Sequence, residues 1–119
     1  IIIDDMISSG ESIIEVATEL KRRKANRIFA AATFGSSQMD LSKFDKAYEE
    51  GVLTGVLTTN LIYQTPELLS KPYYINCDMS KYIALIIDTL NHDGSLSQIL
   101  SPNERIQNVL RKYKNGEKI

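Results

Sequence analysis

The first twelve residues decide the fold, and they read IIIDDMISSGES (residues 1–12). Three consecutive isoleucines predict a short buried strand over residues 1–3, because β-branched side chains favour strands. Asp4 and Asp5 follow this strand, then a loop of small residues, and then a predicted helix over residues 12–23. A buried strand, two acids, a small-residue loop and a helix are typical of an α/β protein with a parallel sheet.

Strand-like and helix-like segments alternate along the rest of the chain. The predicted strands are continuously apolar, which suits a parallel sheet covered on both faces. We therefore expect an α/β fold, a three-layer parallel sheet flanked by helices with right-handed crossovers. The predicted strands are 1–3, 27–34, 55–59 and 73–77, and the predicted helices are 12–23, a short one around 44–51, and 80–91.

A last helix is predicted to open at Ser101-Pro102-Asn103-Glu104, which has the spacing of a capping box with proline at the first helical position. We expect an α/β domain over residues 1–100, and a C-terminal helix with a polar tail over residues 101–119. Four strands make a thin sheet, and the chain opens inside a strand without any lead-in. We therefore expect the chain to be an incomplete piece of a longer protein.

The composition narrows the function classes. The chain has 119 residues and a mass of 13.4 kDa, which suits one core. Fourteen Lys and Arg against fifteen Asp and Glu give a net charge of -1, which argues against nucleic-acid binding through bulk positive charge. No apolar run approaches the roughly 18 residues of a membrane-spanning helix. One cysteine and one histidine exclude an internal disulfide and a His-rich metal site, so we expect a cytoplasmic protein.

The loop after the first strand carries the predicted chemistry. In open parallel sheets, ligands bind outside the carboxyl ends of the strands. A small-residue loop that enters a helix directs backbone N–H groups and the positive end of the helix dipole at an anion such as phosphate. Asp4 and Asp5 only accept hydrogen bonds when ionised, so they suit sugar hydroxyls or Mg²⁺. Together these groups predict a site for a pentose phosphate.

A purely structural interpretation of the same residues is also open. Ser8 and Glu11 have the spacing of a capping box, and two aspartates after a strand often only form a turn. The predicted strand before the loop and the helix after it favour phosphate binding.

Residues 1–12 resemble the phosphoribosyl-binding motif of type I phosphoribosyltransferase folds, which has four apolar residues, two acids and a loop rich in threonine and glycine. Within that superfamily the chain resembles ribose-phosphate pyrophosphokinase, also called phosphoribosyl pyrophosphate synthetase, from residue 1 to about residue 100. The further segments that carry this resemblance are RIFAAATF (27–34), VLTTN (56–60) and NHDGSLS (91–97).

The resemblance implies an enzyme of nucleotide biosynthesis, a cytoplasmic homo-oligomer that uses Mg²⁺. Such an enzyme transfers the diphosphoryl group of ATP to ribose 5-phosphate, which gives phosphoribosyl pyrophosphate and AMP. The resemblance makes Asp4 and Asp5 the ligands of the ribose hydroxyls and the candidate Mg²⁺ ligands. It assigns the 5-phosphate to a loop made of Ser8, Ser9, Gly10, Glu11 and Ser12.

We assign no catalytic residue in this chain, because diphosphoryl transfer depends on positioning and charge neutralisation. The family segments that bind ATP lie upstream, so we expect the chain alone to be inactive and to need a missing N-terminal half. Glu11 places a carboxylate where the family often has glycine. Two alternatives therefore stay open, a nucleobase phosphoribosyltransferase with the same motif and an inactive, synthetase-like regulatory subunit.

Overall fold

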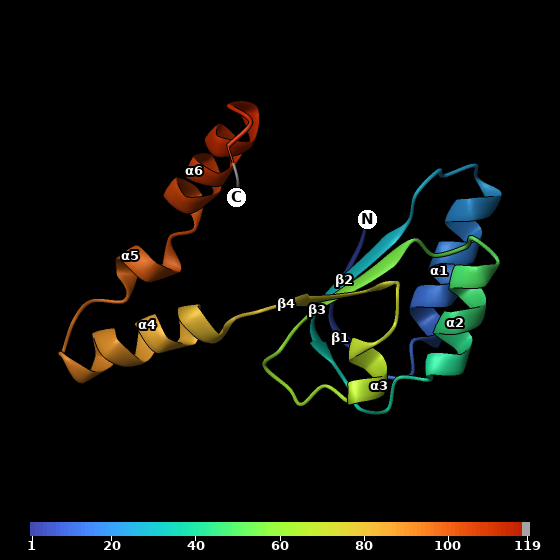
Figure 1. Ribbon diagram of the computed structural model, residues 1–119, viewed down its shortest axis with the longest axis horizontal. Helices are drawn as coiled ribbons and strands as arrows, with labels where there is room; N and C mark the ends of the chain where they lie inside the picture. The colour runs from blue at the N-terminus through green and yellow to red at the C-terminus, as the bar shows by residue number, and fades with distance from the viewer. Residues whose placement is uncertain (118–119) are drawn as a thin grey trace. The chain divides into compact units, whose positions relative to one another are not determined.

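The structure is a computed structural model that describes residues 1–117, apart from the side chains at positions 98, 100 and 105 (Figure 1). The chain divides into two compact units, Ile1–Met79 and Ser80–Ile119. Each unit is described by itself. The boundary predicted at residue 100 stays a prediction.

The first unit is a parallel α/β sheet in which a helix connects each strand to the next (Figure 1). The sheet has four strands in the order β1-β2-β3-β4. This confirms the predicted α/β class with a parallel sheet. The expected third layer is not present within this unit, because its core lies on one face of the sheet and Ile3 and Ile75 on the other face are exposed. The strands are β1 (Ile2–Ile7), β2 (Phe29–Gly35), β3 (Gly55–Thr59) and β4 (Tyr74–Cys77), and the helices are α1 (Glu11–Arg22), α2 (Leu41–Glu49) and α3 (Pro66–Leu69).

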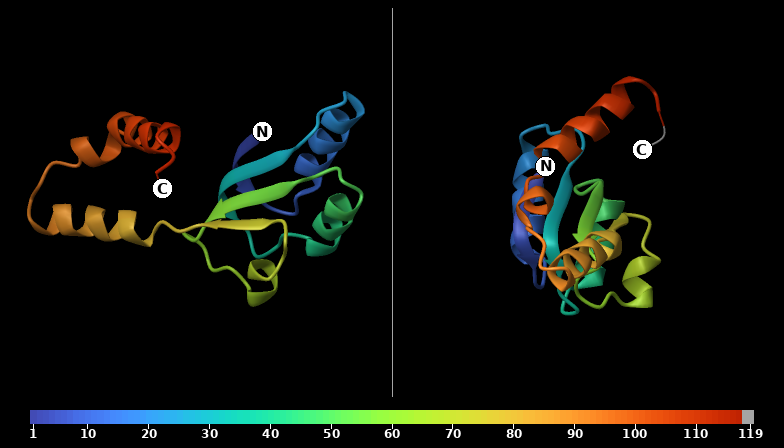
Figure 2. Two further views of the ribbon diagram at one scale, coloured as in Figure 1. Left: turned by 45° about the horizontal axis from the view of Figure 1, so that its top comes forward. Right: turned by 90° about the vertical axis from the view of Figure 1, so that its left-hand side faces the viewer.

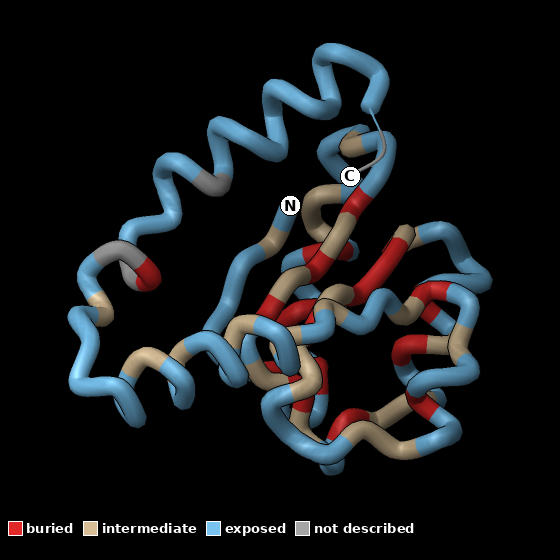
Figure 3. Tube along the Cα trace, turned by 60° about the vertical axis from the view of Figure 1, so that its left-hand side comes forward, coloured by how far each residue is buried: buried red, intermediate tan, exposed pale blue. Residues whose placement is uncertain are grey.

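The core lies between the sheet and the helices α1 and α2, which contact each other (Figure 2). Ala30 and Ala32 occupy the middle of β2, and their small side chains let the two helices approach the sheet. Buried positions accordingly concentrate on β2, on β3 and on the inner sides of these helices (Figure 3). The residues at the centre of this core are Ile7, Ile13, Ala17, Ala30, Ala32, Phe44, Ala47 and Val56.

A polar cluster ties α2 to the segment between α3 and β4. The carboxylate of Asp45 accepts a hydrogen bond from Lys71 Nζ at 2.7 Å and another from the Tyr73 hydroxyl at 2.8 Å. Tyr73 is only 2% exposed, and its ring lies 5.4 Å from that of Tyr48 and 6.4 Å from that of Phe44. The Lys71 ammonium lowers the pKa of Asp45, whereas burial first and Asp45 second raise the pKa of Tyr73.

The second unit contains three helices, α4 (Ser80–Asn91), α5 (Ser97–Leu100) and α6 (Asn103–Lys114). Within it, the Tyr82 hydroxyl donates a hydrogen bond of 2.7 Å to the backbone oxygen of Ile99. None of the helices described here has the length and apolar character needed to cross a membrane.

Several predicted boundaries need correction. The first strand does not end at Ile3 but continues to Ile7, because Met6 and Ile7 still pair with β2. The capping box predicted at Ser101 is wrong: α6 begins at Asn103 after Pro102, and no side chain caps it. The predictions for 55–59 and 80–91 match β3 and α4 at both ends. Two one-turn helices, α3 and α5, were not predicted.

Candidate functional site

The loop of residues 8–10 lies at the carboxyl edge of the sheet, between the end of β1 and the start of α1. Two backbone hydrogen bonds fasten it to the segment that follows β2. The Ser36 N–H donates to the Ile7 oxygen at 2.9 Å, and the Asp40 N–H donates to the Ser9 oxygen at 3.2 Å. The loop that the sequence assigns to phosphate is therefore held against the segment that follows β2.

Gly10 is the N-cap of α1 and has a left-handed backbone, with φ of 89°. A Cβ atom at this position would overlap the ring of Phe44, which is fully buried. Glycine is thus required here both for the backbone conformation and for the close approach of α2.

The start of α1 suits an anion better than it suits a capping box. A capping box would make Ser8 the N-cap, but the N-cap is Gly10, and no side chain caps the helix. The Ser9 hydroxyl lies 3.5 Å from the Glu11 nitrogen, which is at the limit of a hydrogen bond. The first N–H groups of a helix have no partner within the helix, so those of α1 can donate to a ligand at the loop.

The sequence predicts that Asp4 and Asp5 follow the first strand. In the structure both residues lie within β1. Both are exposed, and Asp4 Oδ1 accepts a hydrogen bond of 2.8 Å from the Asp5 N–H. Successive strand residues point to opposite faces, so the two carboxylates do not share a face. Asp4 is in register with Ala32, which packs in the core beneath α1, so Asp4 lies on the α1 side of the sheet.

The described residues contain no group of three or more His, Cys, Asp and Glu side chains that could hold a metal ion. A pair of exposed carboxylates is still compatible with Mg²⁺. This ion commonly uses one or two protein carboxylates and completes its octahedral shell with water and substrate phosphates. Because their carboxylates point to opposite faces of β1, either Asp4 or Asp5 could supply one such carboxylate, but the two do not form a chelating pair.

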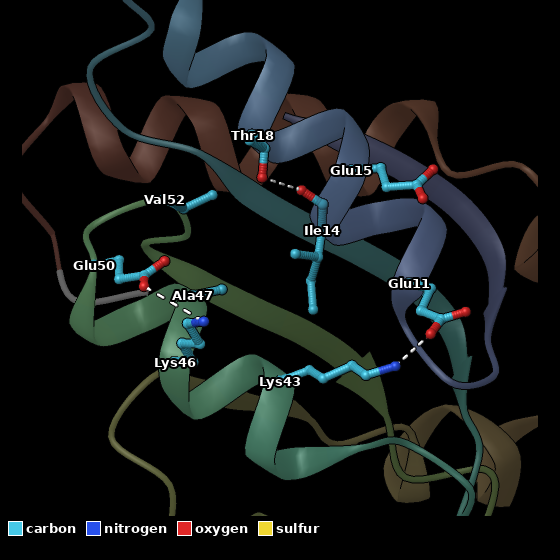
Figure 4. A pocket seen from close by; sticks show the side chains of 9 residues that line it. All are labelled: Glu11, Ile14, Glu15, Thr18, Lys43, Lys46, Ala47, Glu50 and Val52. Carbon is cyan, nitrogen blue, oxygen red and sulfur yellow. Dashed lines mark hydrogen bonds and ion pairs between the residues drawn. The ribbon is translucent and has the colours of Figure 1, made fainter.

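The carboxylate of Glu11 is directed toward α2, where it forms an ion pair with the ammonium group of Lys43 (Figure 4). The same ammonium group lies 3.8 Å from Asp40 Oδ2. The hydrogen bond to Glu11 raises the pKa of Lys43. The pKa of Asp40 is lowered, mainly by the hydrogen bond that its carboxylate accepts from Ser42. Sequence reasoning missed Lys43, because no local pattern pairs residues 32 positions apart.

Glu11 and Lys43 also line a pocket of about 330 Å³ between α1 and α2 (Figure 4). Its other charged pair is Lys46 and Glu50, whose charged atoms lie 3.9 Å apart. Of the predicted site residues, Glu11 lines this pocket, whereas Asp4, Asp5 and the loop residues 8–10 do not.

The carboxyl ends of β3 and β4 are joined by side-chain hydrogen bonds. The Asn60 amide donates to Asp78 Oδ1 at 2.8 Å, and its oxygen accepts from the Met79 N–H at 2.8 Å. Buried Thr58 lies 2.6 Å from the Tyr74 hydroxyl, which also accepts from Gln64. These contacts fix the edge of the sheet on which the loop lies.

This is a parallel α/β domain with a small-residue loop at the carboxyl edge of its sheet, the edge at which open parallel sheets bind their ligands. Residues 1–101 match the family model described as phosphoribosyl synthetase-associated domain. The chain belongs to this family, and the resemblance stated from the sequence is confirmed.

Two curated relatives illustrate the family. The chain is 31% identical over 101 residues to a ribose-phosphate pyrophosphokinase of Shewanella oneidensis. The aligned region covers 85% of this chain and 31% of that protein. It is 30% identical over 99 residues to phosphoribosyl pyrophosphate synthase-associated protein 2 of Homo sapiens, which covers 83% of this chain and 26% of that protein. The chain thus spans about a third or less of the length of these relatives.

The fold is similar to that of a solved structure, the phosphoribosylpyrophosphate synthetase from Mycobacterium smegmatis. The TM-score is 0.64 at 23% sequence identity, and the match covers 77% of this chain and 30% of that one. The predicted α/β architecture is therefore also found in a solved structure.

Proposed function

We propose that the chain is the ribose 5-phosphate-binding part of an enzyme that makes phosphoribosyl pyrophosphate and AMP from ATP and ribose 5-phosphate. One observation carries the proposal. In a chain of the synthetase-associated family, the loop of residues 8–10 joins the carboxyl end of β1 to a helix capped only by Gly10. This arrangement leaves backbone donors for a phosphate at the edge where parallel sheets bind ligands.

The residues divide the ligand between them. The hydroxyls of Ser8, Ser9 and Ser12 and the backbone N–H groups from Gly10 onward donate to the 5-phosphate oxygens. Asp4 accepts hydrogen bonds from the ribose hydroxyls, because it lies on the same side of the sheet as α1. Asp5 lies on the opposite face and contributes mainly negative charge to the candidate Mg²⁺ site.

The reaction needs positioning more than covalent catalysis. The 1-hydroxyl oxygen of ribose 5-phosphate attacks the β-phosphorus of ATP, the bond from that phosphorus to the oxygen of the α-phosphate breaks, AMP leaves with that oxygen, and the hydroxyl proton is released to solvent. This chain's residues hold the sugar so that its 1-hydroxyl is oriented for this attack. Mg²⁺, when bound, neutralises charge on the phosphates of ATP. The ATP site is expected in other segments of the protein, and the whole enzyme is expected to be a cytoplasmic homo-oligomer.

A second candidate is a synthetase-like regulatory subunit without activity of its own. Two observations favour it: the 30% identity to a synthase-associated protein, and the carboxylate of Glu11 in the phosphate loop. Both candidates use the same ribose 5-phosphate site, and they differ in turnover.

The deciding experiment is AMP release from ATP, with and without ribose 5-phosphate, by the full polypeptide that carries this sequence. Release that depends on ribose 5-phosphate supports the enzyme. A folded protein that binds ribose 5-phosphate but releases no AMP contradicts the enzyme and supports the regulatory subunit. Release of diphosphate from phosphoribosyl pyrophosphate when a nucleobase is added would instead indicate a phosphoribosyltransferase.

A further inference from the structure

The loop assigned to phosphate contains a negative charge. Glu11 is the first residue of α1, next to the loop, and Asp40 is joined to the loop by the hydrogen bond from its N–H to the Ser9 oxygen. Two carboxylates beside a phosphate dianion would weaken its binding by repulsion. The described residues must offset this repulsion if the loop is to bind phosphate.

Lys43 contacts both carboxylates. Its ammonium group pairs with Glu11 and lies 3.8 Å from Asp40 Oδ2. Lys43 projects from α2, one residue before Phe44, whose buried ring packs beneath Gly10. The backbone of α2 at Lys43 is therefore fixed relative to the loop by the core, and the ion pair has a defined direction.

We propose that Lys43 is a positioning residue for the phosphate loop. It holds the Glu11 carboxylate toward α2, over the pocket between the helices and away from the N–H groups that face the phosphate (Figure 4). Lys43 acts through Glu11 and is not itself a ligand of the phosphate. This inference rests on the proposed ribose 5-phosphate site.

A double-mutant cycle on Glu11 and Lys43 tests the inference, with the dissociation constant for ribose 5-phosphate measured by isothermal titration calorimetry. Lys43→Gln frees the Glu11 carboxylate, and we expect roughly a three- to fivefold weaker binding, the scale of an exposed ion pair. In the Glu11→Gln background the Glu11 carboxylate is gone and only the longer contact of 3.8 Å with Asp40 is lost, so the same substitution costs much less. Lys43→Arg keeps the ion pair and is expected to restore binding.

Lys46→Gln is the matched charge control. Lys46 lies one turn further along α2, lines the same pocket, and pairs with Glu50 instead of the loop. We expect it to change binding no more than Lys43→Gln does in the Glu11→Gln background. An equal loss from Lys43→Gln in both backgrounds, or from Lys46→Gln, overturns the inference while ribose 5-phosphate binding by the unmodified protein stands. A folded, unmodified protein that binds no ribose 5-phosphate overturns the proposed function, and the inference falls with it.

Discussion

Gly10 and Phe44 meet so closely that a single added carbon on Gly10 would overlap the Phe44 ring. This contact packs the start of α1 against the buried side of α2. It therefore restricts the position of the loop of residues 8–10, which ends at Gly10. The proposed phosphate site therefore depends on a packing contact as well as on polar groups.

The first prediction concerns this contact. Gly10→Ala combines a left-handed backbone with overpacking against Phe44, and we expect it to lower the free energy of unfolding by about 2–4 kcal/mol. Chemical denaturation followed by circular dichroism measures the loss. Gly51→Ala is the matched control, because Gly51 also has a positive φ, of 67°, but its Cβ would meet nothing within 4 Å. A loss at Gly10 no larger than at Gly51 would contradict the packing argument.

The second prediction concerns the hydroxyl of Tyr73. Tyr73→Phe removes the hydrogen bond to Asp45 and keeps the ring contacts with Tyr48 and Phe44. We expect a loss of about 1 kcal/mol in the free energy of unfolding. Tyr63→Phe serves as the control, because the Tyr63 side chain is 73% exposed and should tolerate the change. Equal free energies of unfolding for the Tyr73 variant and the original protein would show that the hydrogen bond from Tyr73 to Asp45 does not stabilise the fold.

The third prediction is a pH dependence of stability that comes from Asp45. Lys71 lowers the pKa of Asp45 below its ordinary value of 3.8, so the folded state binds the proton more weakly than the unfolded state. The stabilisation is present in full above the unfolded pKa and is lost as the pH falls through the folded one. In the Asp45→Asn variant, the free energy of unfolding should therefore decrease less steeply as the pH is lowered below about 4. The free energy of unfolding is measured by denaturation at pH values from 6 to 2. If it falls equally steeply with pH in the variant and in the original protein, Asp45 does not contribute to the pH dependence.

The fourth prediction separates the two aspartates. Asp4 shares the side of the sheet with α1, whereas Asp5 points to the opposite face. We expect Asp4→Asn to weaken ribose 5-phosphate binding roughly tenfold or more, the cost of losing a charged hydrogen-bond partner, and Asp5→Asn to weaken it less. Titration calorimetry with Mg²⁺ present gives both constants. A larger loss of binding from Asp5→Asn than from Asp4→Asn would show that the face of β1 on which a side chain lies does not determine its contact with the ligand.

The sequence predicted the elements well wherever apolar periodicity dominates. The strand 55–59 and the helix 80–91 have the predicted ends, because each is an apolar segment with irregular backbone at both sides. The predicted first strand is too short because two aspartates are unfavourable in a strand by local preference, whereas backbone pairing with β2 continues to Ile7. Pairing with a neighbouring strand is a tertiary effect that local residue preferences do not contain.

The candidate site was predictable in its residues but not in its geometry. The loop after β1 was identified from spacing and from the resemblance to the family. The opposite faces of Asp4 and Asp5 follow from the longer strand, and the ion pair between Glu11 and Lys43 follows from the packing of α1 on α2. The short helix α3 had a readable signal that was missed, because Thr65 caps it and Pro66 is its first residue.

The most direct test of the central claim is the binding of ribose 5-phosphate to this protein by titration calorimetry in the presence of Mg²⁺. The account predicts saturable binding at one site, weakened by Asp4→Asn and unaffected by Lys46→Gln. Absence of binding by a protein that circular dichroism shows to be folded, or equal binding by the original protein and the Asp4 variant, would contradict it.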